Sequence, residues 1–412
     1  MAGHVQDRWY KTETGPDGKP RRVKTDRYGT GMRYRARYIG PDGKETSQSF
    51  PDRQKRKAED WLTQIEADMA RGQYIDPRAA RTTFQEFAER FLASQVGDPN
   101  TQASMQSQLR RHAFPLVGMR PLGSFQPSHI RDMVGRLEAS PISGSYARVI
   151  FSNVRAVLSA AVDDGHLPRN PCDARTVRPP VVGAKRVVPW ELARVLAVRA
   201  ALTERYRTLV DLGAGCGLRQ GEMLGLAVES LDFEDGQLHV THQLKLSRSK
   251  PVFAPPKGGK LRDVPLPDPV AESLREHMRR CPPVSITLPW MKLGGPPVTR
   301  RLLFTGPAGG HVWRNVLNED HWKPALVAAG AIPAPARGER YAPAREDGMH
   351  ALRHFYASVL LDAGESIKAV SEYLGHADPG LTLKVYAHLM PDSRNRARKA
   401  IEAVFRSQDH QG

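Results

Sequence analysis

The stretch His350-Ala351-Leu352-Arg353-His354, followed by Leu374-Gly375-His376 and by Tyr386-Ala387-His388, decides how the C-terminal part of this chain folds. His350 and Arg353 are three residues apart, so they share a face of a helix. The apolar pattern of residues 357–361 continues that helix, and Gly364 suits its end. A second helix is predicted over residues 366–373 and a short third one before Tyr386. Two imidazoles, a guanidinium and a phenol therefore lie on three consecutive helix-turn units.

Each of these side chains also has a plainer interpretation. A tyrosine near a C-terminus is usually an amphipathic core residue with a solvated hydroxyl. His350 and His354 are four residues apart, as in some metal sites, but the glutamate or the paired cysteines that would complete such a site are missing. We predict no metal ligand and no cofactor, and the combination is much less common than its parts.

The combination resembles the C-terminal signature of the tyrosine recombinases, the lambda-integrase family. In that family His-x-x-Arg and Leu-Gly-His precede a nucleophilic tyrosine, and this chain matches at His350, Arg353, His376 and Tyr386. It departs at Phe355, where many relatives carry threonine, and this is not a catalytic position. The resemblance implies that an arginine and a lysine of the same site lie upstream.

Candidates for both residues occur upstream. The run Gly217-Leu-Arg219-Gln-Gly-Glu222 matches the family's Gly-Leu-Arg-x-Gly-Glu motif at every fixed position, so Arg219 is the implied arginine. Glu222 lies one helical turn later, and we expect it to orient the arginine or the backbone without taking part in the chemistry. The family's lysine lies in a hairpin that residues 256–266 resemble. Lys257 is the first choice, and Lys260 and Lys250 are rivals because a slip of register changes which amine reaches the site.

The chemistry implied by the resemblance is attack on a phosphodiester. The transition state places extra negative charge on the non-bridging oxygens, which Arg219 and Arg353 can bind through forked hydrogen bonds. Tyr386 is the implied nucleophile and His350 its base or proton relay. The family implies a 3′-phosphotyrosine and a free 5′ hydroxyl, with no need for ATP or a divalent metal. The resemblance further implies that His376 donates a hydrogen bond to a non-bridging oxygen. Lys257 is the implied acid that protonates the leaving 5′ oxygen.

The composition favours a polyanionic partner. Among 412 residues, 61 Lys and Arg outnumber 44 Asp and Glu, which gives a formal net charge of +17. A basic surface can also serve solubility. Three widely spaced cysteines, Cys172, Cys216 and Cys281, indicate a reducing compartment and argue against a disulfide framework. The sequence shows no long apolar run and no apolar leader, so we predict a protein of the bacterial cytosol, associated with the nucleoid and without a membrane partner.

Residues 1–75 predict a small β-sheet followed by one helix. Residues 15–18 and 40–43 are turn signals, and a helical pattern covers residues 52–70. Alternation in residues 32–39 separates apolar side chains from a second face, which carries Arg33, Arg35 and Arg37. An arginine face suits a DNA groove, whereas the plainer interpretation is a charged edge strand that resists aggregation. The arrangement resembles the arm-site DNA-binding domain of many phage-type integrases.

Residues 82–172 predict an all-α domain, and residues 185–412 a mixed domain with the candidate site. The first begins at a capping box, Thr83-x-x-Glu86, and by resemblance it is the core-binding domain. The second has predicted strands at residues 238–241 and 261–265, a helix at 312–329, and proline-rich loops at 282–297 and 332–346. Its last predicted helix, at 394–405, is of a kind that commonly docks onto a neighbouring protomer in this family. The predicted fold class is mainly α with small β-sheets (α+β).

The sequence therefore predicts a site-specific DNA recombinase of the integrase type, from a phage or another mobile element. The implied partners are double-stranded attachment sites of core and arm type, further copies of the chain in a tetramer on DNA, and optionally an excisionase and a DNA-bending host factor. The alternatives are a non-catalytic DNA-binding protein and a chromosome-dimer-type recombinase on the same fold. A metal-dependent nuclease would need clustered carboxylates that the sequence does not offer.

Overall fold

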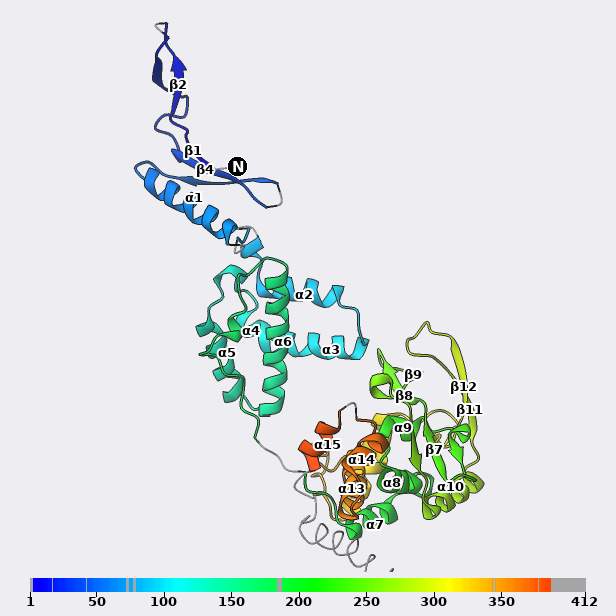
Figure 1. The fold of residues 1–412 in the computed structure, drawn as a ribbon. Helices are drawn as coiled ribbons and strands as arrows, with labels where there is room; N and C mark the ends of the chain where they lie inside the picture. Colours follow the sequence, from blue (N-terminus) through cyan, green and yellow to red (C-terminus); the bar gives the residue numbers. More distant parts are fainter. Residues whose placement is uncertain are drawn as a thin grey trace, which may run out of the picture. The chain divides into compact units, whose positions relative to one another are not determined.

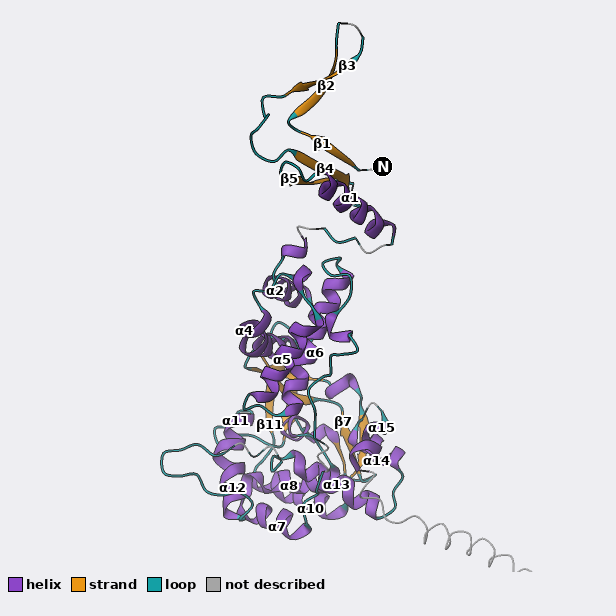
Figure 2. Cartoon of the chain, turned by 90° about the vertical axis from the view of Figure 1, so that its left-hand side faces the viewer, coloured by secondary structure: helices purple, strands orange, loops and turns teal. Residues whose placement is uncertain are grey.

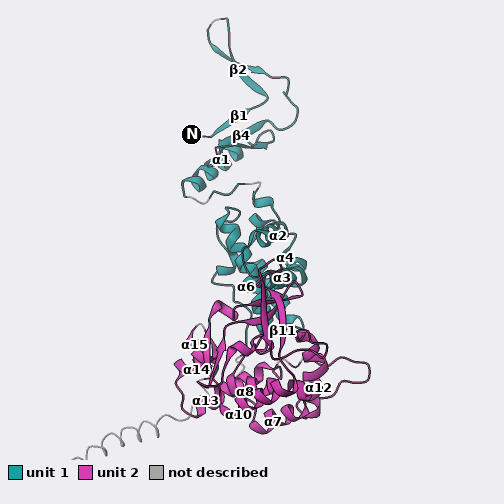
Figure 3. Cartoon of the chain, turned by 90° about the vertical axis from the view of Figure 1, so that its right-hand side faces the viewer, with its two compact units in different colours: residues 1–183 teal, residues 184–412 magenta. Residues whose placement is uncertain are grey.

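The computed structural model describes residues 3–386, with gaps at residues 17, 42, 72–73, 77–78, 184–186, 343, 345 and 377. The chain forms two compact units, residues 1–183 and 184–412 (Figure 3). Unit 1 contains two clusters of buried side chains, one under the N-terminal sheet and one among the helices that follow it. Unit 2 is organised around one larger cluster.

The N-terminal sheet has three antiparallel strands in the order β1-β4-β5, formed by β1 (His4–Asp7), β4 (Tyr34–Ile39) and β5 (Glu45–Phe50). Helix α1 (Lys55–Ala70) packs on the sheet. β4 alternates as predicted: Tyr34, Ala36 and Tyr38 are buried, and the arginines between them are only half-buried. Tyr38 meets Trp61 of α1 edge to face at 5.6 Å. The apolar face of β4 therefore holds the helix against the sheet.

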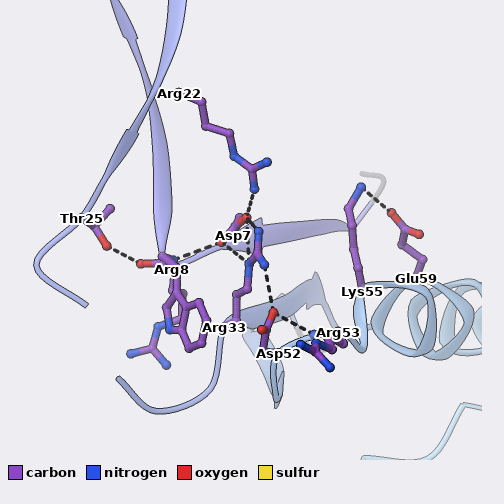
Figure 4. Close-up of polar contacts among 10 residues, drawn as sticks. Asp7, Arg8, Arg22, Thr25, Arg33, Asp52, Arg53, Lys55 and Glu59 are labelled. Atoms are coloured by element: carbon purple, nitrogen blue, oxygen red, sulfur yellow. Dashed lines mark hydrogen bonds and ion pairs between the residues drawn. The ribbon is translucent and has the colours of Figure 1, made fainter. Parts of the chain in front are cut away.

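A hairpin of β2 (Tyr10–Thr14) and β3 (Pro20–Lys24) is inserted between β1 and β4, and its residues are almost all exposed. The predicted turns form in this hairpin and between β4 and β5, with φ of +75° at Gly18 and +76° at Gly43. Asp7 joins the hairpin to the sheet, because its Oδ2 accepts hydrogen bonds from Arg22 Nη2 at 2.5 Å and Arg33 Nη2 at 3.0 Å (Figure 4). Burial acts to raise the pKa of Asp7, but the hydrogen bonds from Arg33 and Arg22 hold it below its ordinary value.

The helical part of unit 1 consists of five α-helices, one of them preceded by a π-helical turn at Leu109–Ala113: α2 (Phe84–Ser94), α3 (Pro99–Gln108), α4 (Phe114–Val117), α5 (Pro127–Ala139) and α6 (Gly144–Asp163). The predicted capping box starts α2, where Thr83 Oγ1 accepts from Glu86 N at 3.3 Å and Glu86 Oε2 accepts from Thr83 N at 2.9 Å. The long helix α6 buries an apolar stripe against α2 and α5. Where they are described, residues 174–191 contain neither helix nor strand.

Unit 2 is built around α8 (Glu204–Cys216), which packs against α7 (Leu192–Ala201), α10 (Asp268–Arg280) and α13 (His350–Asp362) (Figure 1). A three-stranded sheet in the order β10-β7-β6 lies beside these helices, and Figure 2 shows how small the strands are compared with the helices. Its strands are β6 (Leu231–Asp232), β7 (Gln237–Val240) and β10 (Arg262–Pro265). The remaining α-helices among the described residues of this unit are α9 (Gln220–Leu224), α11 (Arg314–Val316), α12 (Lys323–Ala328), α14 (Ile367–Leu374) and α15 (Pro379–Tyr386).

The predicted loop at residues 282–297 is wrong, because these residues form most of a hairpin of β11 (Val284–Pro289) and β12 (Pro297–Leu302). The prolines that suggested a loop lie at the ends of the strands, where a missing N–H is tolerated, and Pro289 is the register partner of Pro297. A second hairpin, formed by β8 (Gln243–Ser247) and β9 (Lys250–Ala254), was also not predicted. It comes between β7 and β10 in the sequence.

The predicted fold class, mainly α with small β-sheets, is confirmed by these elements. The predicted helix at residues 394–405 lies outside the described residues. In the part of the chain that is described, none of the helices has both the length and the apolar content needed to cross a membrane.

Gly217 ends α8 in a conformation that we predict no other residue can adopt without cost. Its φ is +64°, and a Cβ there would come within 2.4 Å of the Tyr356 ring. Gly217→Ala should therefore add about 1–3 kcal/mol of backbone strain and a further cost for displacing a packed ring, about 1–3 kcal/mol. Urea unfolding followed by circular dichroism measures the loss of stability.

Gly309→Ala is the matched control for this prediction. Gly309 has a φ of +76°, but a Cβ added there would meet no atom within 4 Å, so only the backbone strain should be seen. Equal losses of stability for the two variants would show that the contact with Tyr356 does not constrain Gly217.

Candidate active site

Arg219 lies at the turn from α8 into α9, directly before the first residue of α9. Glu222, in the first turn of α9, accepts hydrogen bonds from the Arg219 backbone N at 2.9 Å and from its Nη1, also at 2.9 Å. Arg219 Nη2 donates to the Gly375 carbonyl at 3.2 Å. One guanidinium thus connects the start of α9 to the end of α14.

Arg262, which was not predicted as a site residue, holds the same carboxylate. Its Nη1 and Nη2 donate to Glu222 Oε1 at 3.0 Å and Oε2 at 2.6 Å, and its Nε donates to the Tyr373 carbonyl at 2.7 Å. Burial acts to raise the pKa of Glu222, but the hydrogen bonds and charge of Arg262 and the charge of Arg219 keep it below its ordinary value. The sequence did contain a signal that Arg262 is buried. Side chains alternate between the two faces of a strand, so Arg262 shares a face of β10 with the buried Val264.

Arg353 is the largest fully buried side chain of the described residues, with 1% exposed. It donates to the carbonyl of Gly217 through Nη1 at 2.7 Å and to the carbonyl of Leu374 through Nη2. Burial, and then the positive charge of Arg219, lower the pKa of Arg353, while the guanidinium stays protonated at neutral pH. Arg353 is therefore held by backbone oxygens at the ends of α8 and α14.

The hydroxyl of Tyr386 lies beside His354, not beside the predicted His350. His354 Nδ1 is 2.6 Å from Tyr386 Oη, and Tyr386 is only 2% exposed. His350 lies one helical turn earlier on α13, with its ring edge-on to that of His354 and the centroids 4.7 Å apart. Burial raises the pKa of Tyr386 to about 12. The sequence signal for His354 was its position four residues after His350, on the same helix face.

His376 follows α14 after Gly375, and its Nδ1 lies 2.8 Å from Thr382 Oγ1 on α15. Gly375, which ends α14 with a φ of +61°, turns the chain at this point. Burial, followed by the charges of Arg353 and Arg219, lowers the pKa of His376 to about 4. Burial and the neighbouring His354 have the same effect on His350, whose pKa is also about 4, so these imidazoles are neutral at physiological pH.

The candidate lysines differ in their surroundings. Lys257 is exposed in a 3₁₀ turn, Lys257–Gly259, in which Gly258 and Gly259 have φ of +82° and +72°. Lys260 Nζ donates to the His376 carbonyl at 3.2 Å. Lys250 starts β9, next to the tip of the β8–β9 hairpin. Residues 256–266 are therefore a glycine turn followed by β10, which pairs with β7, while β9 before the turn pairs with β8, so the predicted lysine hairpin does not form as one hairpin.

Of the arginines predicted to face DNA, Arg35 and Arg37 lie on β4 of the other unit and Arg33 directly precedes that strand, and all three have protein partners there. Arg33 pairs with Asp7 and with Asp52, the latter at 2.9 Å. Arg35 Nε donates to Ser47 Oγ at 2.9 Å, and Arg37 pairs with Glu45 at 3.2 Å. Among the described residues, no group of three or more His, Cys, Asp or Glu side chains is arranged to hold a metal ion.

Part of unit 2, which contains the candidate site, matches the model of a known protein family. The model of the Phage integrase family matches residues 187–309. The matched stretch contains Arg219, Glu222, both candidate lysines of the glycine turn, and Arg262, whereas α13, α14 and α15 follow it.

Two similar proteins cover most of the chain. One is a tyrosine recombinase XerC-like protein of Caldanaerobacter subterraneus subsp. tengcongensis, 26% identical over 305 residues, which are 70% of this chain and 74% of that protein. The other is a putative prophage phiRv2 integrase of Mycobacterium tuberculosis, 23% identical over 390 residues, which are 92% of this chain and 94% of that protein.

Solved structures share the fold. The Tn1549 transposon integrase in complex with transposon right end DNA has a TM-score of 0.64 at 19% identity, over 78% of this chain and 99% of that one. A lambda integrase tetramer bound to a Holliday junction has a TM-score of 0.55 at 17% identity, over 87% of this chain and 93% of that one. Together, the family match, the two similar recombinases and this common fold support a tyrosine recombinase.

Proposed function

We propose that the protein is a site-specific recombinase, the integrase of a phage or another mobile element, which cuts and rejoins DNA through a 3′-phosphotyrosine. The observation that carries this proposal is the hydroxyl of Tyr386, which lies 2.6 Å from an imidazole. The buried guanidinium of Arg353 lies on the same helix as that imidazole, and Arg219 and Arg262 lie at the ends of neighbouring elements. A nucleophile, neutral bases and fixed cations are the groups that phosphoryl transfer needs.

The charges of the site suit an anionic substrate. Arg219 and Arg262 share the single carboxylate of Glu222, and Arg353 is held by uncharged carbonyls. The cluster therefore carries excess positive charge, which a phosphodiester would neutralise. In our proposal Arg219 and Arg353 bind the non-bridging oxygens, while Glu222 and Arg262 position Arg219.

The proposed step exchanges one phosphodiester for another. Tyr386 Oη attacks phosphorus, the bond from phosphorus to the 5′ oxygen breaks, and the 5′ oxygen leaves with a proton from Lys257. His376 donates to a non-bridging oxygen, and His350 relays the proton that the phenol loses. The free 5′ hydroxyl of a partner strand then reverses the step, so no external energy source is consumed.

The proposed partner is double-stranded DNA with core-type and arm-type attachment sites. Residues 1–75 would bind the arm sites through Arg33, Arg35 and Arg37, residues 82–172 would bind the core site, and residues 185–412 would catalyse. Integrases of the same fold have been solved with DNA and as a tetramer on a Holliday junction, which supports assembly of this chain on DNA. An excisionase and a DNA-bending host factor are proposed accessory partners, and the bacterial nucleoid the proposed place of action.

Integration and excision are favoured over chromosome-dimer resolution by the extent of the matches. The prophage integrase matches 92% of this chain, whereas the XerC-like protein and the XerC of Proteus mirabilis match 70% and 71%. The N-terminal sheet and its inserted hairpin are the part of the fold that this proposal assigns to arm sites.

The nucleophile is tested with a nicked suicide substrate that carries the core site, in EDTA. The natural chain should form a covalent protein-DNA adduct, and Tyr386→Phe should form none, because it lacks the attacking oxygen. Tyr373→Phe, which removes a hydroxyl from α14, is the matched control and should keep the adduct. Binding of the correct site without any adduct from the natural chain would favour a non-catalytic DNA-binding protein.

The general acid is tested with a substrate whose bridging 5′ oxygen is replaced by sulfur, because a thiolate leaves without a proton. The Lys257→Ala variant should cleave the ordinary substrate about 10²- to 10⁴-fold more slowly than the natural chain. It should cleave the sulfur substrate at nearly the natural rate. Lys260→Ala should show no such rescue, since its amine is bound to the His376 carbonyl. Rescue of Lys260→Ala alone would transfer the role to Lys260.

A further inference from the structure

His354 is the one imidazole that the structure, over its described residues, places in hydrogen-bonding contact with Tyr386, at 2.6 Å between Nδ1 and Oη. The contact joins α13 to the last described residue of α15, and the two rings are tilted by 57° with centroids 5.6 Å apart. His354 does not belong to the matched positions of the family signature. A buried phenol normally has a hydrogen-bond partner, and the partner here is an imidazole, a group that can also accept a proton.

The protonation states of the two groups determine the direction of the hydrogen bond. Burial, and then the charge of Arg353, lower the pKa of His354 to about 4, so the ring is neutral at physiological pH. Burial raises the pKa of Tyr386 to about 12, so the phenol is protonated. The phenol therefore donates to Nδ1, and the hydrogen of the neutral ring lies on Nε2.

We propose that His354 is the base that accepts the proton of Tyr386 during attack on the phosphodiester, and that the same hydrogen bond aims the phenol oxygen. The inference rests on the proposed function, because it specifies a step of that reaction. It reassigns the direct contact with the phenol from His350 to His354, and His350 then acts only through the ring of His354, which it meets edge-on.

The proton moves together with the attack, not before it. A base with a pKa near 4 does not deprotonate a phenol with a pKa near 12 in the resting site. As the bond between Oη and phosphorus forms, the phenol oxygen becomes strongly acidic. A phosphodiester bound at Arg219 and Arg353 also offsets the positive charge that opposes protonation of His354.

The step is balanced in atoms and protons. The bond between Oη and phosphorus forms, the bond between phosphorus and the 5′ oxygen breaks, and the Tyr386 proton moves to Nδ1. The 5′ oxygen takes a proton from the proposed lysine acid. In rejoining, the imidazolium returns its proton to the departing phenolate, and the lysine recovers its own from the attacking 5′ hydroxyl.

Three substitutions of His354 distinguish a role as a base from a role as an anchor for the phenol. An asparagine can place its amide oxygen near the position of Nδ1 and keep the hydrogen bond, but an amide accepts no proton at neutral pH. His354→Phe removes both functions and should slow single-turnover cleavage of the nicked core-site substrate by about 10²- to 10⁴-fold. His354→Asn should be slowed by a similar factor, and free imidazole should restore part of the activity of His354→Ala.

The pH profile gives a readout that a structural role would not change. The charged and titratable groups that face His354 are Arg353 and His350 on α13, Tyr386 on α15, and His376 after α14. Cleavage by the natural chain should fall at acidic pH, where the imidazole is already protonated, and this fall should be absent from His354→Asn. His350→Asn should retain it.

The control measurements establish that the variants are folded and bind DNA. Circular dichroism and a gel shift on the core site should be unchanged for every variant, and His321→Asn, on the segment between α11 and α12, should cleave at the natural rate. Natural-rate cleavage by His354→Asn, or loss of the acidic limb in His350→Asn instead, would overturn the assignment. If the natural chain forms no adduct that depends on Tyr386, the proposed function itself fails, which is a different outcome from either.

Discussion

The buried carboxylate of Glu222 is the constraint on which the site depends. With 1% of its surface exposed, it accepts hydrogen bonds from Arg219 and from Arg262. A buried carboxylate without cations, or two largely buried guanidiniums without an anion, would cost several kcal/mol. Each ion is therefore stable only when the start of α9 and strand β10 lie together, and Arg262 extends the connection to the end of α14 through the Tyr373 carbonyl. The ion pairs thus fix the spacing of three elements that lie far apart in the sequence.

Arg353 adds a second set of restraints to the same elements. Its two hydrogen bonds end on the carbonyls of Gly217 and Leu374, which lie at the two turns that lead to Arg219 and to His376. Gly217 and Gly375 both have positive φ, so both turns depend on residues without a Cβ. Burial depresses the pKa values of the site's imidazoles, and the charge of Arg353 adds to this effect. The site therefore combines neutral bases with fixed positive charge before any phosphate is present.

The N-terminal arginines show a different use of charge. Alternation along β4 was predicted correctly, yet the pattern did not reveal that Arg33 is enclosed by Asp7 and Asp52. Asp7 lies on β1 and Asp52 after β5, so both carboxylates come from neighbours that only the folded sheet brings together. Arg33 consequently holds the β2–β3 hairpin to the sheet through the Asp7 that it shares with Arg22. Any role of this arginine in DNA binding would come in addition to that structural one.

The sequence by itself determined the features that depend on neighbouring residues. The capping box at Thr83, the glycine turns, the helix periods of α2 and α6, and the side-chain types of the site all follow from local patterns, and the fold class follows from them. Only the tertiary structure decided which histidine meets Tyr386, that Arg262 shares the carboxylate of Glu222, and that residues 284–302 form a hairpin. These features join residues 32 and 40 positions apart, or depend on strand pairing. Periodicity shows which side of an element a residue occupies, but the partner on that side is set by the packing of the whole unit.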